Sequence, residues 1–216
     1  MVYEDLVALI ERVRIDNDDI YDPYKWSDIE LGTYLSATQD LLCDELNLIP
    51  DVLTISYTAG NALVERPTYI TQVRHVYDSA GTEVELISYN EWHRLQGSAG
   101  WRIETGAPSV LIEDMYVGYW RLDKIPVSDG TLSVDVYRRA LEPLSTSEVP
   151  ELMESLQQEA MILGARAQSY RKQDADIFDD KQADRLDVKF HMALSQLETA
   201  VKRKQRRPGT VLYGGI

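Results

Sequence analysis

The hydrophobic pattern of this chain changes its period twice, and this change constrains the fold more than any single motif. Apolar residues recur every three or four positions over residues 2–48, every second position over much of 52–142, and every three or four positions again after Pro150. The longer period is that of a helix with one buried face, and the shorter is that of a strand. The chain therefore predicts helices at both ends and β structure between them.

The N-terminal section predicts two helices separated by an acidic turn. Leu9 and Val13 lie on one face of the first helix, and the aspartate-rich run 16–22 ends it. We expect the second helix to begin at Ser27. Ser27 and Glu30 have the spacing of a capping box, in which each side chain bonds the other residue's backbone amide.

The middle section predicts strands and one short helix. Apolar and polar residues alternate over 53–57, and the turn sequence at 78–81 indicates a hairpin. Ser88 and Glu91 form a second capping-box pattern, so a helix is expected over Tyr89 to Gln96, stopping at Gly97. This section is expected to be a small antiparallel β module placed between helices.

The C-terminal section predicts a helical hairpin. Its first helix is expected to start at Pro150, a residue well suited to the first helical position. Its second helix runs from Ile177 into the basic residues 202–207. Burial of about a dozen apolar side chains stabilises such a hairpin by ~20–30 kcal/mol. Ordering about fifty residues costs more, at about 1–2 kcal/mol each. The hairpin must therefore pack on the N-terminal helices, on neighbouring subunits, or on both.

These sections together predict an α+β fold. Two N-terminal helices (1–50) and the C-terminal helical hairpin (144–207) are expected to form a helical bundle. Residues 51–143 are expected to form the inserted β module, and 208–216 an extended docking tail.

The charge of the chain is strongly acidic and uneven. The 216 residues include 36 acidic and 22 basic ones, for a net charge of -14, which disfavours general affinity for nucleic acid or anionic membranes. Residues 1–50 hold twelve acids against three bases, whereas 201–216 hold five bases and no acid. Ends of opposite sign can pair within a chain or between neighbours in a ring. The alternative is two solvated termini.

The C-terminus combines this basic cluster with an apolar tail. After Pro208-Gly209 the chain ends as Thr-Val-Leu-Tyr-Gly-Gly-Ile over 210–216. An isolated monomer gains little from an apolar tail held beyond five cations. A tail that docks on another subunit buries that surface and gains stability.

Compartment signals are sparse. Cys43 is the single cysteine, so an intrachain disulfide is impossible, and its leucine-rich surroundings favour a buried, inert thiol. The N-terminus lacks the pattern of a signal peptide, and no run of apolar residues approaches the ~20 that a membrane span needs. We expect synthesis in the cytoplasm and no membrane partner.

The sequence lacks the usual catalytic and metal-binding patterns. The run 16–22 resembles a calcium loop, but Tyr21 and Ser27 occupy the positions where such a loop needs glycine and glutamate. The three histidines are far apart, and Gly97 to Gly100 has its serine in the wrong place for a hydrolase elbow. We predict no catalytic residue, no metal and no cofactor. A hydrolase whose active site does not show a known pattern is left as one alternative function.

Tryptophans give the main alternative. Trp92, Trp101 and Trp120 lie in the β section and could line a groove for a carbohydrate or another ligand. Aromatic residues in a small β module are more often part of its core, because they bury so much area.

The order of the elements resembles the head-to-tail adaptor (connector) proteins of tailed bacteriophages. Members of that family often show a tryptophan, a Gly-x-Pro before a strand, a strand ending near proline, a tyrosine-ended strand followed by proline, and a proline-led terminal helix. The corresponding residues here are Trp101, Gly106-Ala107-Pro108, Val117–Leu122 with Pro126, Tyr137 with Pro143, and Pro150.

This resemblance implies a structural virion protein without enzymatic activity, located in the neck between capsid and tail. Such adaptors form a ring, typically a dodecamer, that binds the portal and a tail or neck protein. Double-stranded DNA passes through the ring without specific binding. The C-terminal segment of these proteins usually grips the portal, so the implied docking residues are Arg203, Arg206, Arg207, Val211, Leu212, Tyr213 and Ile216.

Overall fold

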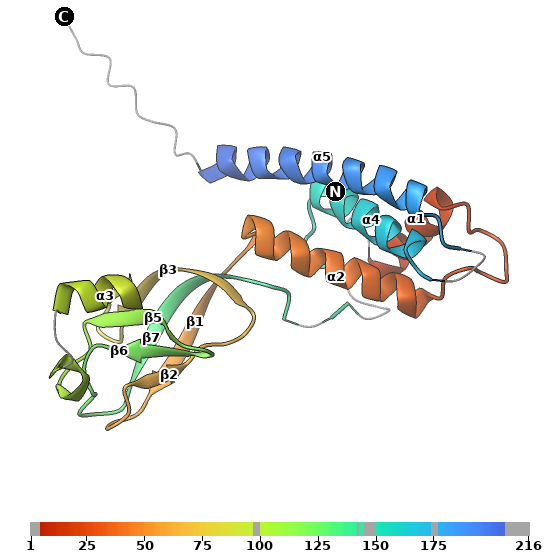
Figure 1. Ribbon diagram of the computed structural model, residues 1–216. Helices are drawn as coiled ribbons and strands as arrows, with labels where there is room; N and C mark the ends of the chain where they lie inside the picture. The colour runs from red at the N-terminus through yellow and green to blue at the C-terminus, as the bar shows by residue number, and fades with distance from the viewer. Residues whose placement is uncertain (1–4, 97–99, 142, 145–149, 174–176, 206–216) are drawn as a thin grey trace, which may run out of the picture. The chain divides into compact units, whose positions relative to one another are not determined.

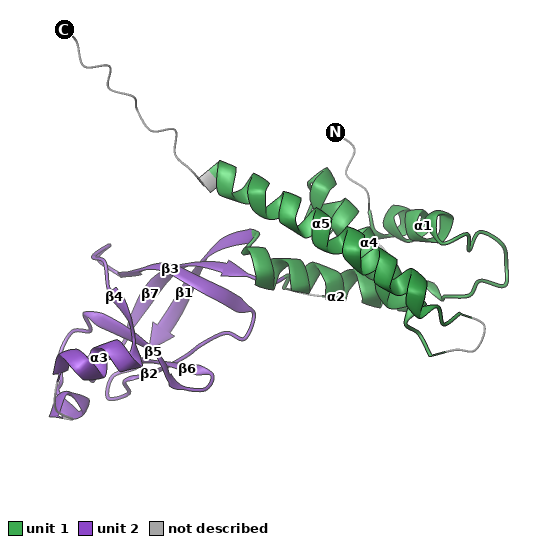
Figure 2. Cartoon of the chain, turned by 45° about the horizontal axis from the view of Figure 1, so that its top comes forward, with its two compact units in different colours: residues 1–48, 140–216 green, residues 49–139 purple. Residues whose placement is uncertain are grey.

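The computed structural model describes residues 5–96, 100–141, 143–144, 150–173 and 177–205 (Figure 1). The chain divides into two compact units, coloured separately in Figure 2. A helical unit comprises Met1–Leu48 and Ala140–Ile216, and a β unit comprises Ile49–Arg139.

The helical unit begins with the two predicted helices. They are α1 (Leu6–Asp16) and α2 (Asp28–Leu46). The capping box at Ser27 is confirmed, since the Ser27 backbone amide donates to Glu30 at 2.9 Å and the Glu30 amide donates to the Ser27 hydroxyl at 3.3 Å. The helix ends at Asn47, which has a left-handed conformation.

The C-terminal helices are α4 (Ser155–Tyr170) and α5 (Asp180–Gln205). The prediction that the first of them starts at Pro150 was wrong by five residues. The Glu154 backbone amide donates to the Gln157 side chain at 3.0 Å, which fixes the helix start one turn later. Met153 and Leu156, the apolar residues nearest this start, are 42% and 45% exposed.

Helix α4 packs against α1, α2 and α5. Its buried residues are mostly small, and at Gly164 it lies close to two neighbouring helices. A Cβ atom at Gly164 would lie 2.4 Å from Thr38 Cγ2 of α2 and 3.2 Å from Phe190 of α5. Glycine therefore permits the three helices to approach at one level.

Ion pairs at the helix ends define the chain directions. Lys172, just after α4, pairs at 2.7 Å with Glu30 near the start of α2, so α4 runs antiparallel to α2. Lys204 at the end of α5 pairs with Glu154 at the start of α4, so α4 is antiparallel to α5 as well. Helices α2 and α5 consequently run in the same direction.

The β unit contains two sheets. The first is antiparallel with the order β1-β7-β3, formed by β1 (Ile49–Tyr57), β7 (Gly130–Arg138) and β3 (Ile70–Asp78). Strands β1 and β7 pair over their full nine residues, from Ile49 opposite Arg138 to Tyr57 opposite Gly130. The second has the order β2-β6-β5-β4, formed by β2 (Leu63–Glu65), β6 (Tyr119–Leu122), β5 (Val110–Tyr116) and β4 (Glu85–Ser88).

The prediction of a helical bundle with a small antiparallel β module was therefore wrong. The described residues include seven strands in two sheets, and one sheet is mixed because β4 pairs parallel with β5. After the turn at Asp78, a single bridge joins Tyr77 to Glu83 before the chain moves to the other sheet. A parallel pair requires a crossover. Helix α3 (Tyr89–Gln96) and a 3-10 turn (Gly100–Ile103) lie in that connection.

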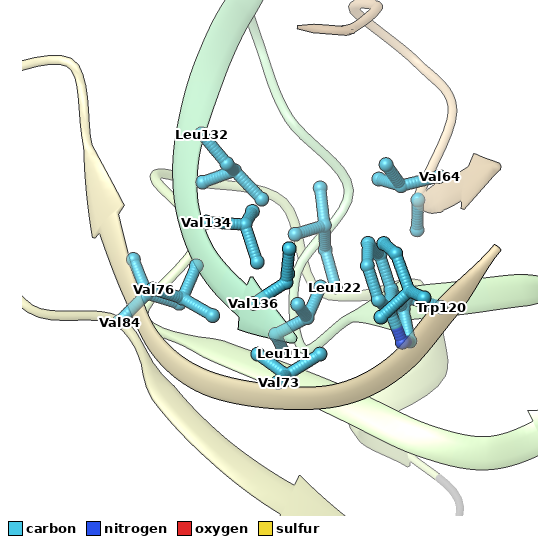
Figure 3. Close-up of a cluster of buried hydrophobic side chains, with 12 residues drawn as sticks. Val64, Val73, Val76, Val84, Leu111, Trp120, Leu122, Leu132, Val134 and Val136 are labelled. Atoms are coloured by element: carbon cyan, nitrogen blue, oxygen red, sulfur yellow. The ribbon is translucent and has the colours of Figure 1, made fainter. Parts of the chain in front are cut away.

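Two apolar clusters stabilise the β unit. Figure 3 shows the first, in which valines of β3 and β7 meet Leu111, Trp120 and Leu122 of the second sheet. The second cluster covers the opposite face of that sheet and contains Ile87, Trp92, Trp101, Val110 and Ile112. Because both faces of β5 are covered, its first three residues are all buried, as expected for a strand inside a layered core.

Candidate docking and assembly surfaces

The end of α5 carries the first part of the predicted docking segment. Lys202 pairs with Glu198 one turn earlier, and Lys204 pairs with Glu154. Arg203 lies between them, is exposed, and has no ion-pair partner within the described part of the chain. Cations at this position also interact favourably with the helix dipole. Of the three, Arg203 is the one whose charge is available to another molecule.

The other predicted docking residues lie outside the described residues. They are Arg206, Arg207, Val211, Leu212, Tyr213 and Ile216. The structure therefore brings none of them together with Arg203, and their docking role stays a prediction.

The three tryptophans of the ligand-binding alternative are buried. Trp120 is 1% exposed in the cluster between the sheets, and Trp92 and Trp101 are 8% and 4% exposed. Trp92 and Trp101 contact each other edge to face, with ring centroids 5.6 Å apart, and the Arg121 guanidinium lies 5.1 Å from the Trp101 ring. A stacking platform needs an exposed indole face. The ligand-binding alternative thus loses the residues on which it rested.

The segment between α1 and α2 is held by a buried arginine. Arg14 donates to Asp19 at 2.8 Å, to Asp28 at 2.6 Å and to the carbonyl oxygen of Trp26 at 2.8 Å. Asp19 is 3% exposed and also accepts from the backbone amide of Lys25 at 2.8 Å. Asp19 is thus a buried residue, although it belongs to the acidic run 16–22 that ends the first helix. The charged pair is compensated by several hydrogen bonds, as burial requires.

A second set of contacts ties the same segment to α4. Arg166 donates to the Asn17 side chain at 2.9 Å and to Asp16 at 3.1 Å. The Trp26 indole nitrogen donates to the Ser169 carbonyl at 3.0 Å, and the Trp26 ring meets Tyr170 edge to face at 5.5 Å. The connection between α1 and α2 is consequently packed against the helices of the helical unit.

Within the described residues, no group of three or more His, Cys, Asp or Glu side chains could hold a metal ion. No helix in the same ranges combines the length and hydrophobicity needed to cross a bilayer.

Comparison with known protein families matches residues 3–212 to the SU10 adaptor protein family. The chain belongs to this family. The match covers nearly the whole sequence, including the helical unit and both sheets. No curated protein matches the chain.

Membership confirms the resemblance to phage head-to-tail adaptors that the sequence indicated. The SU10 adaptor family is a family of structural phage proteins, and this adaptor is a virion component that associates with other virion proteins.

Sequence reasoning missed two exposed apolar residues of this adaptor. Val188 and Met192 of α5 are 62% and 61% exposed on the side of the helix opposite its buried residues. Leu186 and Phe190, by contrast, lie in the buried apolar row of the same helix. The missed signal was a second apolar pair at a spacing of four on the other face, where an isolated subunit needs none.

Proposed function

We propose that this adaptor forms a ring, typically a dodecamer, beneath the portal at the capsid vertex. The ring extends the DNA channel and attaches the tail through a tail or neck protein. The observation that carries this proposal is the family match over residues 3–212, which includes nearly every residue of the chain. The place of action is then the neck of the virion, where the ring takes part in genome ejection.

The C-terminal segment is proposed to dock on the portal. Arg203 supports this role because it is exposed and has no partner in the described residues, while both flanking lysines are paired. The docking contact starts with charge and is completed by the apolar residues beyond Pro208. The proposed set is Arg203, Arg206, Arg207, Val211, Leu212, Tyr213 and Ile216.

The acidity of the chain supports a channel through which DNA moves freely. A net charge of -14 per subunit repels the phosphate backbone, because nonspecific DNA affinity depends on neutralising phosphates with basic residues. Double-stranded DNA is thus expected to pass without specific binding.

The test mixes purified adaptor with portal rings of the same phage. Negative-stain images and particle masses should show one added ring with the full chain. Removal of residues 208–216 should leave a folded protein with an unchanged circular dichroism spectrum that no longer joins portal rings. Arg203→Glu should weaken joining, while Arg94→Glu should not, since Arg94 is an equally charged, 77% exposed helix residue of the β unit.

Two results would contradict this proposal. A shortened chain that joins portal rings as well as the full chain would remove the docking role of the tail. A full chain that remains monomeric in the presence of portal rings would remove the ring itself.

A further inference from the structure

Helix α5 presents a basic face that its own subunit leaves uncovered. Lys181, Arg185 and Lys189 follow each other at a spacing of four, so they form one row on the helix. All three are exposed and have no ion-pair partner within the described ranges. Val188 and Met192 lie beside this row and are more than half exposed.

The acids of α5 lie on a different edge of the helix. Asp184 and Asp187 pair with Arg171, and Glu198 pairs with Lys202. The basic row is therefore not neutralised by its own helix. It combines unpaired cations with the exposed apolar side chains of Val188 and Met192.

Helix α2 presents a face of the opposite character. Its 19 residues contain five acids and no base. Asp28 and Glu30 pair with Arg14 and Lys172 of the same subunit, and Asp40, Asp44 and Glu45 lie in the second half of the helix. Its outer row contains only uncharged residues at a spacing of four, namely Ile29, Thr33, Ala37 and Leu41. Ile29 is 79% exposed and Leu41 is 41% exposed. The face thus offers small and apolar residues flanked by carboxylates.

These two faces cannot meet within one subunit. Thr38 of α2 and Phe190 of α5 both point to Gly164 of α4, so α4 contacts the buried side of each helix. The acidic α2 face and the basic α5 face consequently lie on the outside of the helical unit, each turned away from α4.

We propose that the acidic α2 face of one subunit binds the basic α5 face of the next. This inference rests on the proposed ring and names the contact that closes it. Two different surfaces that bind each other give a head-to-tail interface, and such an interface generates a ring when the rotation closes. The occupant is a second copy of this chain because opposite charge and exposed apolar area are present on the same molecule.

The positions of these residues along the two helix axes fit this contact. Thr38 and Phe190 lie at the level of Gly164, and α2 and α5 run in the same direction. In a ring without axial rise, Val188 and Met192 therefore come level with Ala37 and Leu41. The apolar pair of α5 then meets the uncharged row of α2, and Lys189 comes level with position 37, one helical turn before Asp40.

Cysteine cross-linking of the full chain tests the contact directly. The native Cys43 is fully buried, so a thiol reagent should react with the introduced cysteines and not with Cys43. The double variant Ala37→Cys with Met192→Cys, treated with a short bismaleimide, should give a ladder of covalent oligomers. Either single variant alone should give no dimer, because a head-to-tail contact brings position 37 to position 192 and not to itself.

Charge reversal gives a second, independent readout. Arg185→Glu with Lys189→Glu should raise the protein concentration needed for half-maximal assembly by roughly tenfold or more, because it places like charges across the interface. His191→Glu is the matched control, since His191 is exposed on the same helix but lies on the acidic edge. The control should change this concentration less than about twofold.

Several results would overturn the inference. Dimers from a single cysteine variant would indicate a symmetric contact, and a ring that forms without the 37–192 cross-link would place the interface elsewhere. A reversal that abolished retention of double-stranded DNA in a gel shift but left assembly unchanged would assign the basic face to DNA. A chain that stays monomeric both alone and with portal rings would instead contradict the proposed ring. Failure of the ring can therefore be distinguished from failure of the α2–α5 contact.

Discussion

The helical unit and the β unit bury different kinds of groups. The buried polar side chains of the helical unit include Arg14, Asn17, Asp19, Gln39 and Gln158, whereas among the described residues of the β unit they are Asp123 and Arg138. The β unit instead buries two apolar clusters on the two faces of one sheet. Apolar packing tolerates substitution if volume is kept, but a buried polar network depends on every partner. The helical unit should therefore be the more sensitive of the two to single changes.

The largest expected effect comes from the buried arginine of each unit. Arg14→Met should lower the free energy of unfolding by about 3–5 kcal/mol, because it leaves Asp19 buried without its cation. Arg138→Met in the β unit should cost only about 1–2 kcal/mol, since the Asp51 side chain is 33% exposed and can be hydrated. Urea unfolding with peptide-resolved hydrogen exchange measures both. Equal losses of unfolding free energy for the two variants would contradict the expected difference between the units.

Glycine contacts give the next largest effect. Gly164→Ala should destabilise the protein by about 1–3 kcal/mol, because the new Cβ would lie 2.4 Å from Thr38, a fully buried side chain. Gly130→Ala in the β unit places a Cβ 2.3 Å from the hydroxyl end of Tyr57, which is only partly buried and can move. Its cost should stay below about 1 kcal/mol. Thermal unfolding of both variants measures the two losses of stability. A larger loss for Gly130→Ala than for Gly164→Ala would contradict the expectation.

A smaller effect is expected from the pH dependence of Glu30. The hydrogen bond from Lys172, followed by that from the Ser27 backbone, lowers the pKa of Glu30 from 4.5 to about 2. The carboxylate therefore stabilises the folded helical unit above pH 4.5, and this contribution is lost as the pH falls toward 2.

Glu30→Gln should remove about 0.5 kcal/mol of this pH dependence, a small figure because both partners are partly exposed. Glu91→Gln at the corresponding capping position of α3 is the control in the β unit. Urea unfolding at pH 2.5 and pH 6 would contradict the expectation if Glu30→Gln kept the full difference between the two pH values.

The last expected effect is on the chemical reactivity of Cys43. Burial, followed by the charges of Asp40 and Glu151, raises the pKa of the Cys43 thiol to about 12. Cys43 in the folded protein should react with maleimide at pH 8 more slowly than in urea by roughly a hundredfold or more. Because it is the single cysteine, its labelling rate reports opening of the helical unit and not of the β unit. Rapid labelling of the folded chain would contradict its burial.

The elements that sequence reasoning placed well depend on residues close together in the chain. The capping box of Ser27 and Glu30 and the helix Tyr89–Gln96 are both set within a few residues, and both are confirmed. The signals are short because the backbone groups that need capping lie within one turn. For the same reason, the Glu154 and Gln157 contact could have placed the start of α4 correctly.

Features that depend on distant partners were not predicted. The parallel pairing of β4 with β5 requires the chain to leave β3 after one bridge, and nothing within the hairpin sequence indicates this. The predicted helix at 89–96 was nevertheless the crossover that a parallel pair needs. Burial of Asp19 likewise depends on Arg14 and the packing of a whole segment. Val188 and Met192 were missed because an exposed apolar pair has no partner inside its own subunit.

The full-length pairing of β1 with β7 has a consequence for how this chain can be rebuilt. The strand through which the chain enters the β unit ends its ladder at Ile49, directly opposite Arg138, where the chain leaves. Neighbouring strands are separated by only about 5 Å, little more than the distance between successive Cα atoms. A two-residue turn can therefore join Leu48 to Ala140. The β unit could then be removed or exchanged, and α1, α2, α4 and α5 would remain connected as a shorter chain.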